Sequence, residues 1–190
     1  MSEFISFSDH DPGGKVRLDV PDHVVSEAIY SPCRQYRYIL HRRWGLGEPD
    51  RALMFLMLNP STATEDVDDP TVRKCRNYAN RWGYRHLIVG NIMAYRATDP
   101  GRLRAIDDPI GPDNHQYLRE TIIAYQPLVI CAWGCPPQQL VHVEHLTIDL
   151  LRELGVQPCV LRLNTAGSPG HPLYLAMDTT PQPWPIDELA

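Results

Sequence analysis

Four runs of consecutive apolar residues stand out in the pattern of hydrophobic and polar positions along the chain. A strand that is covered on both faces needs apolar side chains at nearly every position, whereas a half-exposed strand alternates. The runs therefore predict four buried strands of a parallel sheet, at Ala52–Leu58, His86–Met93, Leu128–Trp133 and Cys159–Leu163. The alternating segment Tyr36–Trp44 predicts an additional strand at the edge of the sheet.

Amphipathic helices are predicted between these strands. In Pro70–Trp82 apolar residues recur at helical spacing, and Asp69 is suited to cap the first turn. Two further helices are predicted at Asp113–Tyr125 and Val141–Leu154. Strands that alternate with helices indicate an α/β protein, a three-layer α/β/α sandwich with a mainly parallel central sheet.

The chain of 190 residues is long enough for one sizeable core. We expect a single domain at residues 30–175, an N-terminal tail and lead-in at residues 1–29, and a Pro-rich C-terminal tail at residues 176–190. No apolar run approaches the roughly 20 residues of a membrane span, and the first residues lack the layout of a signal peptide. Five irregularly spaced cysteines fit a reducing compartment. The sequence thus predicts a cytoplasmic protein without a membrane partner or an obligate protein partner.

The net charge of −5 conceals an uneven distribution. Between Arg34 and Arg104 the chain holds twelve Arg and one Lys against seven acidic residues. Guanidinium groups suit bidentate contacts with phosphate or carboxylate better than ammonium groups do. Two interpretations stay open, a surface that binds phosphates and an Arg-rich composition inherited from a high-GC genome.

Polar residues gather where each predicted strand ends. In an open parallel sheet the carboxyl ends of the strands lie at one edge, and ligands bind there. Four polar clusters at that edge predict a binding site, although they do not yet indicate a reaction. The candidate residues are Asn59, Pro60, Ser61, Thr62, Asn91, Tyr95, Arg96, Trp133, Gly134, His171 and Tyr174.

Several of the polar residues near these strand ends also have a structural interpretation. Asn59 is of a type that caps the turn after a strand, and Asp68 and Asp69 are expected to be partners of the following helix rather than catalysts. Together with Asp66 and His171 these acids form the weak case for a divalent cation. Because no HxxxH, HxH or CxxC spacing is present, no metal and no other cofactor is predicted.

The ordered segments YSPCRQYRYIL, LMLNPSTA, DDPTVRKC, NIMAYRATDP, IGPDNHQYL, CAWG and GHPLYL resemble the bacterial and phage domain-of-unknown-function family 1643 over roughly residues 30–175. That family name carries no chemistry. The order of elements is more distantly similar to the uracil-DNA glycosylase superfamily, especially its mismatch-specific thymine/uracil branch. The matching pieces are Leu58-Asn59-Pro60, Gly90-Asn91, Arg96-Ala97-Thr98, Gln126-Pro127, Trp133-Gly134 and Gly170-His171-Pro172.

The resemblance implies a uracil-DNA-glycosylase-like fold and a metal-independent DNA base glycosylase. Its substrate would be a modified, damaged or mismatched base, most simply a pyrimidine, flipped out of the DNA. By the same resemblance Asn59 would hold the attacking water and His171 would donate a hydrogen bond to the departing base. Asn91 would read the base edge with a paired donor and acceptor, and Tyr95 or Trp133 would stack on the base.

Departures from the superfamily keep other functions open. Ser61 and Thr62 follow the Asn-Pro pair where better-known branches carry Gly or Tyr, and Leu173 replaces the Ser expected after His-Pro. Asn59 stands where the uracil branch has an acid. The alternatives are therefore a non-catalytic module that binds a nucleobase or nucleotide, and a metal-dependent hydrolase that uses the acids of the DDPT segment. Repair, nucleotide metabolism and defence against phages all stay open as roles.

Overall fold

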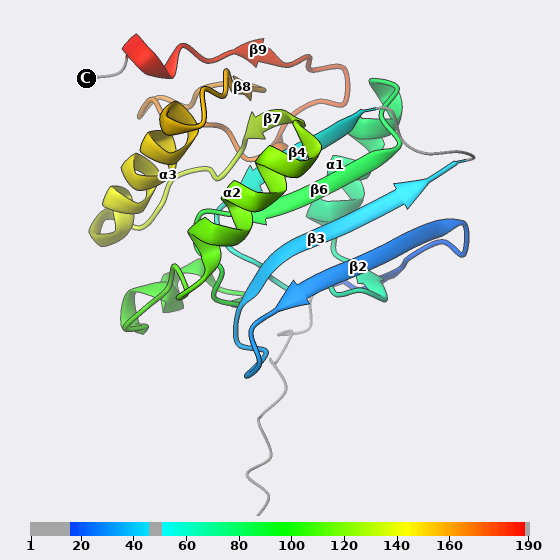
Figure 1. The fold of residues 1–190 in the computed structure, drawn as a ribbon, viewed down its shortest axis with the longest axis horizontal. Helices are drawn as coiled ribbons and strands as arrows, with labels where there is room; N and C mark the ends of the chain where they lie inside the picture. Colours follow the sequence, from blue (N-terminus) through cyan, green and yellow to red (C-terminus); the bar gives the residue numbers. More distant parts are fainter. Residues whose placement is uncertain (1–15, 46–50, 189–190) are drawn as a thin grey trace, which may run out of the picture.

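A seven-stranded sheet forms the centre of the molecule in the computed structural model, which describes residues 16–45 and 51–188 (Figure 1). The first half of the predicted N-terminal tail, residues 1–15, lies outside the described residues. Two short strands, β1 (Leu18–Asp19) and β5 (Val67–Asp68), pair with each other. The large sheet consists, in spatial order, of β2 (Val24–Tyr30), β3 (Arg37–Trp44), β6 (His86–Asn91), β4 (Ala52–Met57), β7 (Leu128–Cys131), β8 (Cys159–Val160) and β9 (Gln182–Pro183).

The four predicted apolar runs form the four adjacent parallel strands β6, β4, β7 and β8. The sheet as a whole is mixed rather than mainly parallel, because β2, β3 and β9 run antiparallel to their neighbours. An apolar run indicates that a strand is buried but not in which direction it runs, so the pattern does not distinguish a mainly parallel sheet from a mixed one. The expectation of an edge strand at Tyr36–Trp44 is wrong, because β2 pairs along the outer side of β3.

The sheet also extends past the predicted domain limits at residues 30 and 175. Strand β2 lies almost entirely in the segment predicted as tail and lead-in, and β9 lies in the predicted C-terminal tail. Most positions of β2 are partly exposed, so its pattern gives little sign of a buried strand. Strand β9 is itself exposed and is followed by Trp184 and Ile186, which are buried in the core. Neither a half-exposed strand such as β2 nor a two-residue strand such as β9 leaves a strong apolar run in the sequence.

Helices cover both faces of the sheet (Figure 1). Helix α1 (Pro70–Arg81) packs with Leu53, Phe55 and Met57 of β4 in one apolar cluster. The alternate residues of β4 face the opposite cluster, which contains side chains of α2 (Asn114–Tyr125) and α3 (Val141–Glu153). Successive side chains of a strand point to opposite faces, which explains why β4 is apolar at every position. Within the described part of the chain no helix has the length and apolar character of a membrane span.

The order of the strands places a crevice at the carboxyl end of β4. The chain passes from β4 through α1 to β6 on one side, and then through α2 to β7 on the other side of β4. Such a reversal is a topological switch point, and ligands of open α/β sheets bind outside the strand ends there. The loops that close this edge carry short 3₁₀ helices, η1 (Pro100–Ala105), η2 (Gln138–Leu140) and η3 (Pro172–Tyr174); a fourth, η4 (Ile186–Glu188), follows β9.

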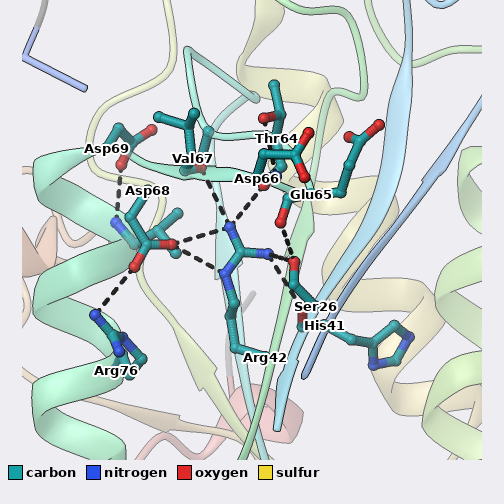
Figure 2. A network of polar contacts seen from close by, with 12 residues as sticks. Ser26, His41, Arg42, Thr64, Glu65, Asp66, Val67, Asp68, Asp69 and Arg76 are labelled. Carbon is teal, nitrogen blue, oxygen red and sulfur yellow. Dashed lines mark hydrogen bonds and ion pairs between the residues drawn. The ribbon is translucent and has the colours of Figure 1, made fainter. Parts of the chain in front are cut away.

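A buried cluster of charges fixes the start of α1 against the sheet. Figure 2 shows the guanidinium of Arg42, from β3, between Asp68 and the backbone of the preceding loop. Arg42 Nη2 lies 2.9 Å from Asp68 Oδ1, and Arg76 Nη2 lies 3.3 Å from Asp68 Oδ2. Burial raises the pKa of Asp68, and the two guanidinium groups oppose that rise. Since Arg42 and Asp68 are fully buried, each needs the other as a counter-charge.

Replacing Asp68 by Asn should lower the free energy of unfolding by about 3–5 kcal/mol, because the substitution leaves Arg42 buried without a counter-charge. Urea unfolding measures the change. The control is Asp149→Asn, which breaks an exposed pair with Arg152 at 3.0 Å and should cost less than about 1 kcal/mol. Equal losses in the two variants would contradict a special role for the buried cluster.

Two buried histidines face each other between β3 and β6. His41 Nδ1 and His86 Nε2 lie 2.9 Å apart, so one nitrogen carries the shared proton and the other accepts it. The pKa of both rings is lowered to about 4, mainly by burial and to a smaller extent by nearby charge, that of Arg43 for His41 and those of His41 and Arg43 for His86. The ring of Tyr125 packs against both. The pair is therefore neutral in the folded protein at physiological pH.

This pair should make the fold sensitive to acid. In the unfolded chain each histidine takes up a proton near its ordinary pKa of about 6.5, but in the folded chain only near 4. Stability is thus fully present above about pH 6.5 and is lost as the pH falls towards 4, by up to about 1.4 kcal/mol per pH unit for each histidine. Urea midpoints measured at several pH values should show a smaller acid loss in His41→Gln/His86→Gln than in the control His145→Gln, whose ring is exposed.

Candidate functional site

A cavity of about 870 Å³ opens at the carboxyl ends of the parallel strands. Its walls come from the ends of β4, β6 and β7, from the first turn of α1, and from the loops that follow β6 and β8. Its size is that of a small-molecule or nucleotide site. The structure brings together in this cavity the predicted residues Asn59, Ser61, Asn91, Trp133, Gly134, His171 and Tyr174.

Four candidates from the sequence do not line this cavity. Pro60 and Thr62 are buried beside it. Tyr95 packs edge-on against Tyr36 with ring centroids 5.6 Å apart, and the Arg96 guanidinium lies 5.3 Å from the Tyr30 ring centroid. The chain beyond β6 turns towards the start of β3, where the backbones of Tyr36 and Tyr95 form a bridge. Tyr95 is therefore not placed to stack on a ligand in the cavity.

Asn59 stands in a fixed orientation just after β4. Its Nδ2 donates to the carbonyl oxygen of Ala97 at 2.7 Å and to that of Pro60 at 2.9 Å. Because both neighbours are acceptors, the nitrogen of the amide must face them. The carbonyl Oδ1 has no hydrogen-bond partner among the described residues. A cavity-lining side chain thus presents an acceptor to the cavity, with the direction of that acceptor set by the backbone.

His171 is held as a donor. Its Nδ1 accepts a hydrogen bond from the backbone N–H of Leu173 at 3.3 Å, where it caps η3. In a neutral imidazole the other nitrogen, Nε2, then carries the proton. The ring lies beside that of Tyr174, which is 81% exposed at the rim. The site therefore combines a fixed acceptor on Asn59 with a donor on His171.

The loop that carries His171 is anchored to α1. The ammonium group of Lys74 donates to the carbonyl oxygen of Leu173 at 3.0 Å and also to that of Leu175. Gly170 approaches the carbonyl oxygen of Arg162 so closely that a Cβ would lie 3.0 Å from it. The close approach explains why a Gly precedes His171. Together the contacts with Lys74 and Arg162 fix the position of the loop relative to α1 and the strand ends.

Arg37 is a cavity residue that the sequence analysis missed. It belongs to β3 and is 2% exposed, yet it reaches the floor of the cavity. Nη1 donates to the carbonyl oxygen of Ala63 at 2.7 Å, Nη2 lies 3.5 Å from Asn91 Oδ1, and Nε has no partner. Burial lowers the pKa of Arg37 and the charge of Asp69 partly offsets this effect, with a resulting pKa of about 10. The guanidinium therefore stays charged at neutral pH.

The contact with Arg37 changes the predicted role of Asn91. The amide oxygen of Asn91 already faces the guanidinium, and its backbone oxygen accepts from Asn114 Nδ2 at 2.9 Å. The group that Asn91 offers to a ligand is therefore its Nδ2 donor, rather than the paired donor and acceptor that the resemblance to the uracil-DNA glycosylase superfamily implied. Trp133 forms part of the same wall but is 1% exposed, and its ring packs against Trp184 at a centroid distance of 5.7 Å.

Both acids of the DDPT segment make contacts that hold the start of α1. Asp68 is taken up by Arg42 and Arg76, and Asp69 Oδ1 accepts from the N–H of Val72 at 2.8 Å, which confirms Asp69 as the cap of α1. Among the described residues no group of three or more His, Cys, Asp or Glu side chains is arranged to hold a metal ion.

Replacing Lys74 by Met should loosen the His171 loop without unfolding the protein, because two hydrogen bonds between α1 and that loop are lost. Hydrogen exchange of the Leu175 amide, which donates to Pro172 in η3, should become about tenfold faster, the equivalent of about 1.4 kcal/mol. The neighbouring exposed residue Arg73 gives the control variant, Arg73→Met. Unchanged exchange at Leu175 would show that Lys74 does not hold the loop.

The model of one protein family, described as protein of unknown function (DUF1643), matches residues 37–173. The matched segment runs from Arg37 to the His171 loop and so contains most of the cavity lining. No curated protein and no solved structure matches the chain.

Proposed function

The chain belongs to a family of proteins of unknown function (DUF1643), and from the geometry of its cavity we propose that it is a metal-independent DNA base glycosylase with a uracil-DNA-glycosylase-like fold. The substrate is a modified, damaged or mismatched base, most simply a pyrimidine. The observation that carries the proposal is Asn59, whose amide hydrogens are both held by backbone carbonyls, so that Oδ1 is directed as an acceptor.

Hydrolysis of an N-glycosidic bond needs a water molecule placed beside C1′ of the sugar. An acceptor with a fixed direction orients that water, since one of its hydrogens bonds to Asn59 Oδ1 and a lone pair then faces the sugar. The C1′–N bond breaks and its electron pair leaves with the base, while the water oxygen forms the new bond to C1′ and the proton that the water loses passes to solvent or to the departing anionic base. Orientation of this kind removes much of the entropic cost of the reaction.

The departing base carries negative charge, and the cavity supplies donors for it. His171 Nε2–H is one donor, fixed by the hydrogen bond that Nδ1 accepts. Asn91 Nδ2 is a second, and the buried positive charge of Arg37 lies behind Asn91. Donors that are in place before the reaction stabilise developing charge without reorganisation. Two donors behind an anionic base support catalysis rather than binding of a neutral ligand.

DNA is the proposed partner, because a base inside a duplex reaches such a cavity only after it has been flipped out. The cavity holds about 870 Å³, more than one pyrimidine requires, and so leaves room for a substituent on the base. Arg162, exposed at the cavity wall, is placed to contact a flanking phosphate. The proposed setting is the cytoplasm, without a membrane.

One observation supports the alternative of a binding module, namely that Asn59 is an amide at the position where the uracil branch that the sequence resembles has an acid. A hydrolase that draws its metal ligands from the DDPT segment is disfavoured, because Asp68 and Asp69 are engaged by two arginines and by α1. Asp68 could bind a metal only after its contacts with the two arginines break. Asp69 uses Oδ1 for the cap, and it belongs to no group of three or more potential metal ligands among the described residues.

A cleavage assay in EDTA tests the proposal. Single- and double-stranded oligonucleotides carry uracil, a mismatched thymine, hydroxymethyluracil, hydroxymethylcytosine or glucosylated hydroxymethylcytosine, and alkali converts abasic sites to strand breaks. We expect breaks on at least one substrate. Asn59→Ala should lower the single-turnover rate about a hundredfold or more while DNA affinity is kept.

The control variant is Asn77→Ala, the same substitution at an exposed position of α1. It should cleave at the rate of the unchanged protein. Absence of breaks on every substrate, from folded protein that still binds one of them, would support the binding module instead. Cleavage that requires added Mg²⁺ or Zn²⁺ would support the metal-dependent hydrolase.

A further inference from the structure

A carboxylate lies in the wall of the cavity in addition to the amides described above. Asp69 lines the cavity although it is only 6% exposed. Its Oδ1 accepts a hydrogen bond from the N–H of Val72 in α1, and Figure 2 shows Asp69 next to Asp68 at the start of that helix. Its Oδ2 has no hydrogen-bond partner among the described residues, and it is not one of the polar atoms sealed inside the protein without a partner. One oxygen of Asp69 therefore serves the helix, and the other is open to the cavity.

The negative charge of Asp69 is stabilised in place. Arg37, in the floor of the same cavity, has no carboxylate within ion-pair distance in the described part of the chain, and Asp69 is the charge that most raises its pKa. The N-terminus of α1 adds a further favourable interaction with an anion. Arg37 Nε is buried without a partner. Arg37 is therefore a buried cation without a paired counter-ion, and the carboxylate of Asp69 supplies negative charge in the same cavity.

The backbone that carries Asp69 is also rigid. The preceding residue, Asp68, is locked between Arg42 and Arg76, and the following residue is Pro70, at the first position of α1. A side chain between two such anchors loses little freedom when a substrate binds. Capping alone does not require a charge, because Ser, Thr and Asn cap helices as well as or nearly as well as Asp.

We infer that Asp69 is the catalytic carboxylate of this site, with Oδ2 acting on the attacking water while Oδ1 caps α1. The inference rests on the proposed glycosylase function and supplies the acid that position 59 lacks. As the C1′–N bond breaks, its electrons leave on the base, which accepts a hydrogen bond from His171. The water oxygen bonds to C1′, and the proton that the water loses passes to Asp69 Oδ2 and then to solvent or to the base.

The test uses two variants that keep the cap and remove the charge, Asp69→Asn and Asp69→Ser. Both residues cap helices, so the melting temperature should stay close to that of the unchanged protein. On the oligonucleotide that the unchanged protein cleaves, single-turnover rates should fall by about 10²–10⁴ in both variants, the usual contribution of a general base. The dissociation constant for the same oligonucleotide should change by less than about threefold.

The outcomes separate the inference from the function on which it rests. If the unchanged protein cleaves and both variants cleave at the same rate, Asp69 is only a cap, and the glycosylase proposal stands without it. If rates fall only in step with lost affinity or a lowered melting temperature, the catalytic role is likewise overturned. If the unchanged protein cleaves none of the oligonucleotides, the proposed function fails and the role of Asp69 fails with it.

Discussion

The buried ion pair between Arg42 and Asp68 is the constraint from which the site follows. Two opposite charges without access to water hold each other strongly, because neither has an alternative partner in solvent. Arg42 comes from β3, the second strand of the sheet, and Asp68 from the segment just before α1, so the pair fixes that segment and the start of the helix together (Figure 2). The Arg42–Asp68 ion pair thereby also positions Asp69 and the first turn of α1, which form one wall of the cavity.

The site itself is ordered by the same principle on a smaller scale. Three polar side chains of the cavity each have one polar atom bound to the protein, which determines what the other atom presents. Asn59 is held through its nitrogen and offers oxygen, whereas Asn91 is held through its oxygen and offers nitrogen. His171 is held through Nδ1 and offers N–H. A cavity whose donors and acceptors are assigned before a ligand arrives loses little energy to reorganisation.

The sequence predicts the parallel centre of the sheet, the three helices and the strand ends that meet at the cavity, because long periodic patterns dominate local structure. Strand direction, β2 and β9 could not be predicted, since short or half-exposed strands leave little pattern. Arg37 was missed because it begins an alternating, Arg-rich segment, and its burial is visible only once β3 is placed between β2 and β6. Tyr95 and Arg96 follow a strand end as Asn59 does, but long-range pairing with Tyr36 carries that loop elsewhere.

The link between Lys74 and the loop at Leu173 joins residues 99 positions apart. A ribosome makes the chain from its N-terminus, so β4, α1 and β6 exist well before that loop does. During synthesis the sheet can begin to fold around its own local contacts, whereas the cavity lacks the wall formed by the His171 loop until that loop has emerged. Until then the nascent chain carries Asn59 and Asp69 on a surface open to water.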